Sequence, residues 1–169
     1  MKSLAKLKQI KGDASFRKFY RNKENNSILV LSKKEKLTTE LAKEFTKYLK
    51  GGEFVFLYGE MGVGKTTFVK YFINEYQKIN NLTQIEIPSP TFSLLNEYQV
   101  KDIRIKHYDL FRINRKEDIN NLDIFEKDNK LITLIEWPQL IADKQDIKFI
   151  TLTFNYLNQL NDRTVDIKV

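Results

Sequence analysis

The sequence predicts one α/β domain built in three layers around a mixed sheet whose central strands are mainly parallel. Two observations support this class. Between residues 28 and 79, short apolar runs typical of buried strands alternate with stretches of helical periodicity, and from residue 91 onward the patterns are mostly strand-like. The chain has 169 residues and is 41% hydrophobic, which is enough to bury one core.

The first half alternates strand and helix. The apolar run Ile28–Leu31 predicts a buried strand. Apolar residues then recur at helical spacing up to Gly51-Gly52, a pair that favours a helix end. These apolar positions are Leu37, Leu41, Phe45 and Tyr48 with Leu49. Glu53–Tyr58 is almost wholly apolar and predicts a strand buried on both faces. A helix is expected from Lys65 to Ile79.

The second half is richer in strands. Thr91–Tyr98 and Ile103–Asp109 flank a short polar turn and predict a hairpin. After it we expect a short helix followed by three strands, at Arg115–Leu122, Leu131–Ile135, Ile147–Phe154 and Thr164–Val169. Residues 1–27 are polar, charged and weakly periodic, so they predict a basic N-terminal arm, with a short strand at Phe16–Tyr20, ahead of a domain at 28–169.

Composition excludes several kinds of site. The chain has no cysteine, which rules out disulfides, thiolate metal sites and cysteine nucleophiles and fits a reducing compartment. His107 is its one histidine, so a site built from several histidines is excluded. The central apolar run Phe54–Tyr58 is far too short to span a bilayer, and the lysine-rich start has no apolar segment behind it. We therefore expect a cytoplasmic protein without a membrane contact.

The net charge of +7 is concentrated at the N-terminus. Residues 1–50 hold 14 basic residues against 5 acidic ones, whereas residues 51–169 hold 15 against 17. Any contact with a polyanion such as RNA is therefore expected to involve this basic first third. A solvated basic face without a partner is the alternative interpretation, because 23 of the 29 basic residues are lysine, a bias that an AT-rich genome also produces.

A phosphate-binding motif follows the strand at Glu53–Tyr58. Gly59-Glu60-Met61-Gly62-Val63-Gly64-Lys65-Thr66 has glycine, four residues, then glycine, lysine and threonine, which is the P-loop pattern. Glycines allow successive backbone N–H groups to converge on an anion, and the following helix adds its positive N-terminal end. Lys65 is expected to contact the β- and γ-phosphates, and the Thr66 hydroxyl to ligate Mg²⁺. The sequence therefore predicts a P-loop NTPase domain that binds a nucleotide with Mg²⁺.

Three residues elsewhere are candidates for catalysis. Glu136 and Asp109 each end a predicted strand, so one is expected to hold the metal and the other to orient or deprotonate the attacking water. Thr91, stiffened by Pro90, is expected to sense the γ-phosphate or its Mg²⁺ as a switch loop does. The alternatives are solvated carboxylates at strand ends and an ordinary transition from loop to strand. For His107, a structural role is favoured.

Four motifs in order resemble the TsaE (YjeE) ATPases. They are Gly59–Thr67, Ser89-Pro90-Thr91-Phe92, His107-Tyr108-Asp109-Leu110-Phe111-Arg112 and Glu136-Trp137-Pro138, and the match covers about residues 28–155. The resemblance implies that ATP binds the loop Gly59–Thr67 and that Mg²⁺ is held by Thr66 and Glu136. It also implies that Asp109, Thr91 and Trp137 are important for activity.

The resemblance also implies a pathway. Members of this family act in the formation of threonylcarbamoyladenosine beside the anticodon of tRNAs that read ANN codons. Their ATPase is weak alone and works with a TsaB–TsaD heterodimer, in which TsaD transfers the threonylcarbamoyl group and ATP hydrolysis supports turnover. The N-terminus departs from the family, because Gly12–Arg21 resembles the opening hairpin of aminoglycoside and sugar phosphotransferases. We interpret it as an appended arm or the relic of a neighbouring or fused gene.

Other functions have less support from the sequence. A small-molecule P-loop kinase would use Arg104, Arg112 and Arg115 on a lid or at an acceptor site, but no evident lid segment follows the P-loop helix. A non-enzymatic RNA-binding module would leave the P-loop unexplained. A GTPase is disfavoured because the sequence has no Asn-Lys-x-Asp motif.

Overall fold

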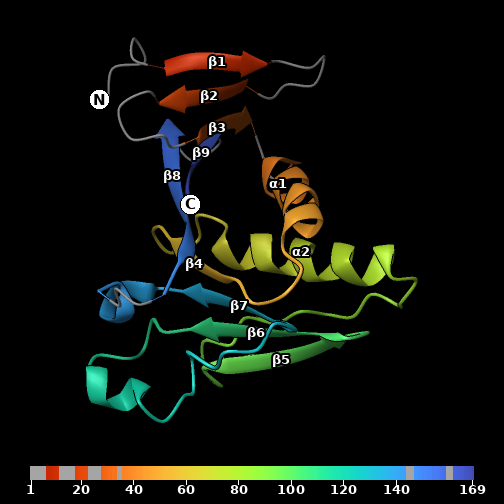
Figure 1. Cartoon of the computed structure of the whole chain (residues 1–169). Helices are drawn as coiled ribbons and strands as arrows, with labels where there is room; N and C mark the ends of the chain where they lie inside the picture. The colour runs from red at the N-terminus through yellow and green to blue at the C-terminus, as the bar shows by residue number, and fades with distance from the viewer. Residues whose placement is uncertain (1–6, 12–17, 23–27, 34–35, 144–146, 159–161) are drawn as a thin grey trace.

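The computed structural model describes residues 7–11, 18–22, 28–33, 36–143, 147–158 and 162–169, and in them it forms one nine-stranded sheet (Figure 1). The strand order is β1-β2-β3-β9-β8-β4-β7-β6-β5. The strands are β1 (Leu7–Lys11), β2 (Lys18–Asn22), β3 (Ile28–Lys33), β4 (Phe54–Tyr58), β5 (Leu95–Val100), β6 (Ile103–Asp109), β7 (Leu131–Glu136), β8 (Phe149–Asn158) and β9 (Asp162–Lys168). The helices are α1 (Lys36–Tyr48) and α2 (Lys65–Ile79), with 3₁₀ turns η2 (Lys116–Ile119) and η3 (Pro138–Ile141).

The centre of the sheet is parallel and its flanks are antiparallel. Strand β4 pairs in parallel with β7 and β8, and β7 pairs in parallel with β6. Strand β5 closes one edge as an antiparallel hairpin with β6, while β9 runs antiparallel to β8 and β3. The predicted mixed α/β sheet with a mainly parallel centre is confirmed. Parallel strands end at the same edge, so the C-terminal ends of β4, β6 and β7 come together there.

Helices α1 and α2 lie on one side of this sheet and share a core with it (Figure 1). Phe45 of α1 meets Phe68 of α2 edge-to-face, with ring centroids 5.5 Å apart, a favoured aromatic arrangement. Leu49 is 1% exposed, whereas Tyr48 is 74% exposed. Of the two alternatives for the next position of the apolar face, Leu49 is confirmed and Tyr48 is not. The helix turns 100° per residue, and at its C-terminal end this rotation carries Tyr48 away from the core.

The other side of the sheet is covered by loops and 3₁₀ turns in the described residues. Its core joins Phe56, Tyr108 and Ile135 of the sheet to Ile124 and Ile141 of these segments. The helix expected at Arg115–Leu122 is only the four-residue turn η2. Strand β5 likewise begins at Leu95 and not at Thr91, because residues 91–93 form a turn closed by a 2.6 Å hydrogen bond from the Leu94 N–H to the Pro90 carbonyl.

The strands of the N-terminal segment continue the sheet. Strands β1 and β2 form an antiparallel hairpin, and β2 pairs with β3, which joins the rest of the sheet through β9. Figure 1 shows this hairpin at the end of the sheet far from β5. The strand expected at Phe16–Tyr20 is found as β2, although Phe16 lies outside the described residues. Most of the segment that resembles a phosphotransferase, residues 12–17, also lies outside them.

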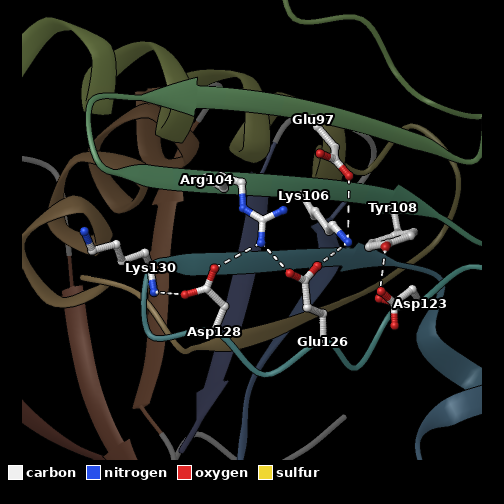
Figure 2. A network of polar contacts seen from close by, with 8 residues as sticks. All are labelled: Glu97, Arg104, Lys106, Tyr108, Asp123, Glu126, Asp128 and Lys130. Carbon is white, nitrogen blue, oxygen red and sulfur yellow. Dashed lines mark hydrogen bonds and ion pairs between the residues drawn. The ribbon is translucent and has the colours of Figure 1, made fainter.

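A polar network fixes β6 to the segment before β7 (Figure 2). The Arg104 guanidinium pairs with Glu126 and, at 3.0 Å, with Asp128. The Lys106 ammonium lies 2.7 Å from Glu126 and 3.7 Å from Glu97. Side chains alternate along a strand, so Arg104 and Lys106 lie on one face of β6, and His107 and Asp109 lie on the opposite face.

Candidate active site

The turn between β4 and α2 has the backbone that a phosphate loop requires. Gly59, Gly62 and Gly64 have φ of 140°, 74° and 115°, a region that side chains with a Cβ rarely adopt. At Gly59 a Cβ would lie 2.6 Å from the Phe154 carbonyl oxygen, so no other residue fits there. No side chain caps the N-terminus of α2. The first N–H groups of this helix are therefore available to an anion.

Lys65 lies over this loop and supplies its cation. Its ammonium donates to the Gly59 and Glu60 carbonyls, at 2.8 and 3.0 Å, and lies 3.9 Å from the centre of the Trp137 ring. Burial lowers the pKa of Lys65, and the nearby carboxylates of Glu136 and Asp109 act in the opposite direction. Its hydrogen-bond partners are neutral carbonyls, and the negative oxygens of a phosphate are stronger acceptors for an ammonium.

Thr66, Glu136 and His107 form a buried chain of polar contacts. The Thr66 hydroxyl donates to Glu136 Oε2 at 3.0 Å, and Glu136 Oε1 lies 2.9 Å from His107 Nε2. Glu136 is 2% exposed and His107 is fully buried. A hydroxyl and a carboxylate are oxygen ligands of the kind Mg²⁺ prefers, and two protein ligands suffice when phosphates and water complete the shell. The described residues contain no cluster of three or more acidic, histidine or cysteine side chains suited to a metal. The donor set therefore fits a metal ion that arrives with a nucleotide.

Asp109 holds the segment that carries Thr91. Its Oδ2 accepts the Thr91 hydroxyl at 2.5 Å and the Ser89 hydroxyl at 3.3 Å, while its Oδ1 accepts the Phe111 N–H at 3.0 Å. Asp109 is 3% exposed. Both oxygens of this carboxylate are thus used to join two loops beside the P-loop.

Two adjoining hollows contain the predicted site residues. One, of about 390 Å³, is lined by Met61, Gly62, Gly64, Lys65, Thr66, Thr67, Ser89, Thr91, Asp109, Phe111, Arg112, Glu136 and Trp137. The other, of about 520 Å³, is lined by Gly59, Glu60, Met61, Val63, Trp137, Gln139, Phe154, Asn155 and Tyr156. The structure brings Thr91, Asp109 and Glu136 together with Lys65 and Thr66 in the first hollow. Gly59, Glu60 and Val63 face the second.

Beside the predicted catalytic residues, three further side chains have contacts in this site. Ser89 shares the carboxylate of Asp109 with Thr91, although it was not chosen as a site residue. Trp137 adopts φ of 57° at the end of β7 and places its ring against both Lys65 and Phe111. His107, for which a structural role was favoured, contacts Glu136. Its position two residues before Asp109 on the same strand was the available signal.

Comparison with known proteins gives one consistent family. The family described as "Threonylcarbamoyl adenosine biosynthesis protein TsaE" matches residues 32–165. Three similar relatives are each named "tRNA threonylcarbamoyladenosine biosynthesis protein TsaE". The Rickettsia typhi protein is 36% identical over 134 residues, which are 79% of this chain and 90% of the relative. The Aquifex aeolicus protein is 36% identical over 65% of this chain and 76% of its own length, and the Bacillus subtilis protein is 32% identical over 63% and 64%.

A solved structure supports the fold. The crystal structure of Bacillus subtilis YdiB matches with a TM-score of 0.60 and covers 83% of this chain and 84% of its own. At 20% sequence identity it bears on the fold alone. In the described residues, no helix is long and apolar enough to cross a membrane.

Proposed function

Because this chain belongs to the TsaE family of threonylcarbamoyl adenosine biosynthesis proteins, we propose that it serves that pathway as a Mg²⁺-dependent ATPase. The observation that carries this proposal is the convergence of Lys65, the Thr66–Glu136 pair and Asp109 in one hollow. Lys65 supplies a cation for phosphate, and Thr66 with Glu136 supplies a pair of oxygen ligands for a metal. Asp109 supplies a carboxylate that hydrogen-bonds the proposed switch loop of Thr91.

The P-loop would bind the phosphates through backbone and side chain together. The glycines expose N–H groups, α2 contributes its N-terminal partial charge, and Lys65 exchanges its carbonyl partners for the β- and γ-phosphates. Glu60 and Val63 line the second hollow with Tyr156 and Trp137. We assign that hollow to the nucleoside, since it adjoins the loop and offers aromatic surfaces for a base to stack on.

Thr66 and Glu136 would hold Mg²⁺ as it arrives with the nucleotide. When bound, the ion would supply positive charge against the negative charge of the phosphates. Asp109 orients the loop of Ser89 and Thr91 toward the same hollow through its hydrogen bonds. Thr91 is placed there to contact the γ-phosphate, and Asp109 and Glu136 divide the tasks of placing water and metal.

The proposed setting is the threonylcarbamoyladenosine modification of tRNAs that read ANN codons, in the cytoplasm. We propose that the ATPase turns over slowly alone and acts with TsaD- and TsaB-like partners. The basic first third of the chain is our candidate for a tRNA contact. We also propose a division into an arm at 1–27 and a domain at 28–169, so that this basic region lies partly in the arm and partly in the domain. A small-molecule kinase is less favoured, because Arg104 and Arg115, two of its three candidate arginines, are engaged in ion pairs with neighbouring carboxylates.

The test measures nucleotide binding and turnover separately. Lys65→Ala should abolish ATP binding in calorimetry, whereas Lys70→Ala, at an exposed position of the same helix, should leave it unchanged. Glu136→Ala should keep part of the binding and stop turnover. ATP turnover is then compared with and without purified TsaB–TsaD-type proteins, together with the yield of modified tRNA. Equal activity of Lys65→Ala and the unchanged protein would refute the site, and phosphorylation of a metabolite in proportion to ATP consumed would favour the kinase.

A further inference from the structure

His107 is a buried polar residue whose hydrogen bonding is incomplete. The ring is fully buried on β6, its Nε2 lies 2.9 Å from Glu136 Oε1, and its Nδ1 has no partner within the described residues. Burying a polar atom without a partner costs free energy that an apolar residue of similar size would not cost. Packing alone therefore does not explain an imidazole at this position. The feature that can explain it is the hydrogen bond between His107 and Glu136.

The direction of this hydrogen bond follows from the two groups. An ionised carboxylate only accepts hydrogen bonds, so Nε2 is the donor and Glu136 Oε1 the acceptor. The other oxygen, Oε2, accepts from the Thr66 hydroxyl at 3.0 Å. The two oxygens of Glu136 thus have different partners, and together these set the orientation of the carboxylate.

The position of the donor, His107 Nε2, depends on the backbone of β6 and on contacts made on the opposite face of this strand. His107 lies between Lys106, held by Glu126, and Tyr108, whose hydroxyl donates to the Leu122 carbonyl at 2.8 Å. Figure 2 shows Lys106 and Tyr108 in this network. Strands β6 and β7 are paired in register, with Asp109 opposite Glu136. The residues on both sides of His107 in β6 therefore make hydrogen bonds on the other face of the strand, and these restrict the position of the imidazole.

We propose that His107 is a positioning residue that holds Glu136 with Oε2 directed to Thr66, and thereby strengthens Mg²⁺ binding at the nucleotide site. This inference rests on the proposed function, in which Thr66 and Glu136 hold the metal. Groups that hydrogen-bond to a metal-binding carboxylate fix its orientation, and removing such a partner costs metal affinity. His107 itself does not contact the metal or the nucleotide in this scheme.

Two amide substitutions separate this role from packing. In His107→Gln the amide nitrogen reaches about as far from the backbone as Nε2 does, so the donor to Glu136 is kept. In His107→Asn the amide is one methylene shorter and ends near the position of Nδ1, so the donor is lost. Both variants bury a neutral amide, which makes them matched in polarity, and His107→Leu reports the effect of an apolar side chain.

The measurement is the gain in nucleotide affinity on adding Mg²⁺, obtained by calorimetry with ADP and a non-hydrolysable ATP analogue in Mg²⁺ and in EDTA. We expect His107→Asn and His107→Leu to reduce the gain about 10-fold or more, the size typical of losing such a partner. Affinity in EDTA should be unchanged, and His107→Gln should keep most of the gain. Thermal melting establishes that each variant is folded.

Three results would overturn the proposal. The same Mg²⁺-dependent gain in His107→Asn as in the unchanged protein would show that orientation of Glu136 does not depend on His107. A loss in His107→Gln equal to that in His107→Asn, or a parallel loss in EDTA, would show a structural role only. If the unchanged protein itself binds nucleotide without any gain from Mg²⁺, the proposed metal site fails first and this inference fails with it.

Discussion

The two faces of β6 carry polar residues of opposite kinds. On the face toward the 122–130 segment, Arg104 and Lys106 pair with Glu126 and Asp128, and charges of both signs are matched (Figure 2). On the other face, neither Asp109 nor the adjacent Glu136 forms a salt bridge with a lysine or arginine of the described residues. Their hydrogen-bond partners there are hydroxyls, an imidazole and a backbone N–H.

This difference distinguishes a structural network from a binding site. Paired charges satisfy one another, so the first network needs nothing from outside the protein. Buried carboxylates without a matching cation are unfavourable alone and become favourable when a cation binds. The charge of Lys65 acts on both carboxylates, but its ammonium donates its hydrogen bonds to carbonyls of the loop. In the proposed function, this face of β6 is the one that receives the metal ion and the phosphates.

The same substitution on the two faces should have opposite consequences. Glu136→Gln removes a proposed metal ligand, and we expect turnover to fall by about 100-fold or more, with little loss of thermal stability because an unmatched buried charge is removed. Glu126→Gln should leave turnover within about 3-fold while lowering the melting temperature, since it weakens the contacts of Arg104 and Lys106. Steady-state ATP hydrolysis and thermal melting of both variants test the comparison, which is wrong if Glu126→Gln affects turnover as strongly as Glu136→Gln.

Asp109→Asn should have the next largest effect. The amide keeps the size of the side chain but replaces one accepting oxygen by a donor, so the hydrogen bonds from Ser89 and Thr91 or from the Phe111 N–H are disturbed. We expect turnover to fall about 10- to 100-fold through misplacement of the Thr91 loop, with ADP affinity nearly unchanged. Asp118→Asn, at an exposed ion pair with Arg115, is the matched control and should change neither. A large loss of ADP affinity in Asp109→Asn would contradict this division of tasks.

The structural face is tested by removing its most buried charge. The Lys106 side chain is 6% exposed, so Lys106→Met keeps an apolar stem of similar length and deletes the ammonium that pairs with Glu126 and Glu97. We expect a destabilisation of about 1–2 kcal/mol, measured by chemical denaturation, and unchanged nucleotide affinity in EDTA. Lys116→Met, which breaks the exposed pair with Asp143, should cost less than about 1 kcal/mol. Equal losses of unfolding free energy in Lys106→Met and Lys116→Met would show that burial of the Lys106 ion pair adds nothing to stability.

The sequence could predict one of these faces and not the other. The phosphate loop is contiguous, and each of its requirements, from the glycines to Lys65 and Thr66, is visible within a few residues. Glu136 follows from strand geometry, because parallel strands place their C-terminal ends at one edge. The partners of Arg104 lie 22 and 24 residues away in a segment without regular structure, and no local pattern specifies such a pairing. The turn at residues 91–93 was missed for a similar reason, since Thr91 bonds to Asp109, 18 residues away, and does not extend β5.

The smallest expected effect is a pH dependence that arises from the carboxylates of the structural face. Hydrogen bonds from Lys106 and then Arg104 lower the pKa of Glu126, and the Lys130 N–H and then Arg104 lower the pKa of Asp128. A carboxyl group whose pKa is lower in the folded than in the unfolded state stabilises the fold above its unfolded pKa. This contribution is lost as the pH falls through the folded pKa. The melting temperature should therefore decline as the pH falls below about 4, the ordinary range of these groups.

Lys106→Met removes the largest cause of the lowered pKa of Glu126, so its melting temperature should depend less on pH in this acid range than that of the unchanged protein. Thermal melting of both proteins at a series of pH values between neutrality and the acid limit of folding measures the difference. Lys116→Met, whose pair with Asp143 is exposed, should follow the unchanged protein. Parallel curves for Lys106→Met and the unchanged protein would mean that the ion pairs of β6 do not couple protonation to folding, and the contrast between its two faces would then rest on catalysis and metal binding alone.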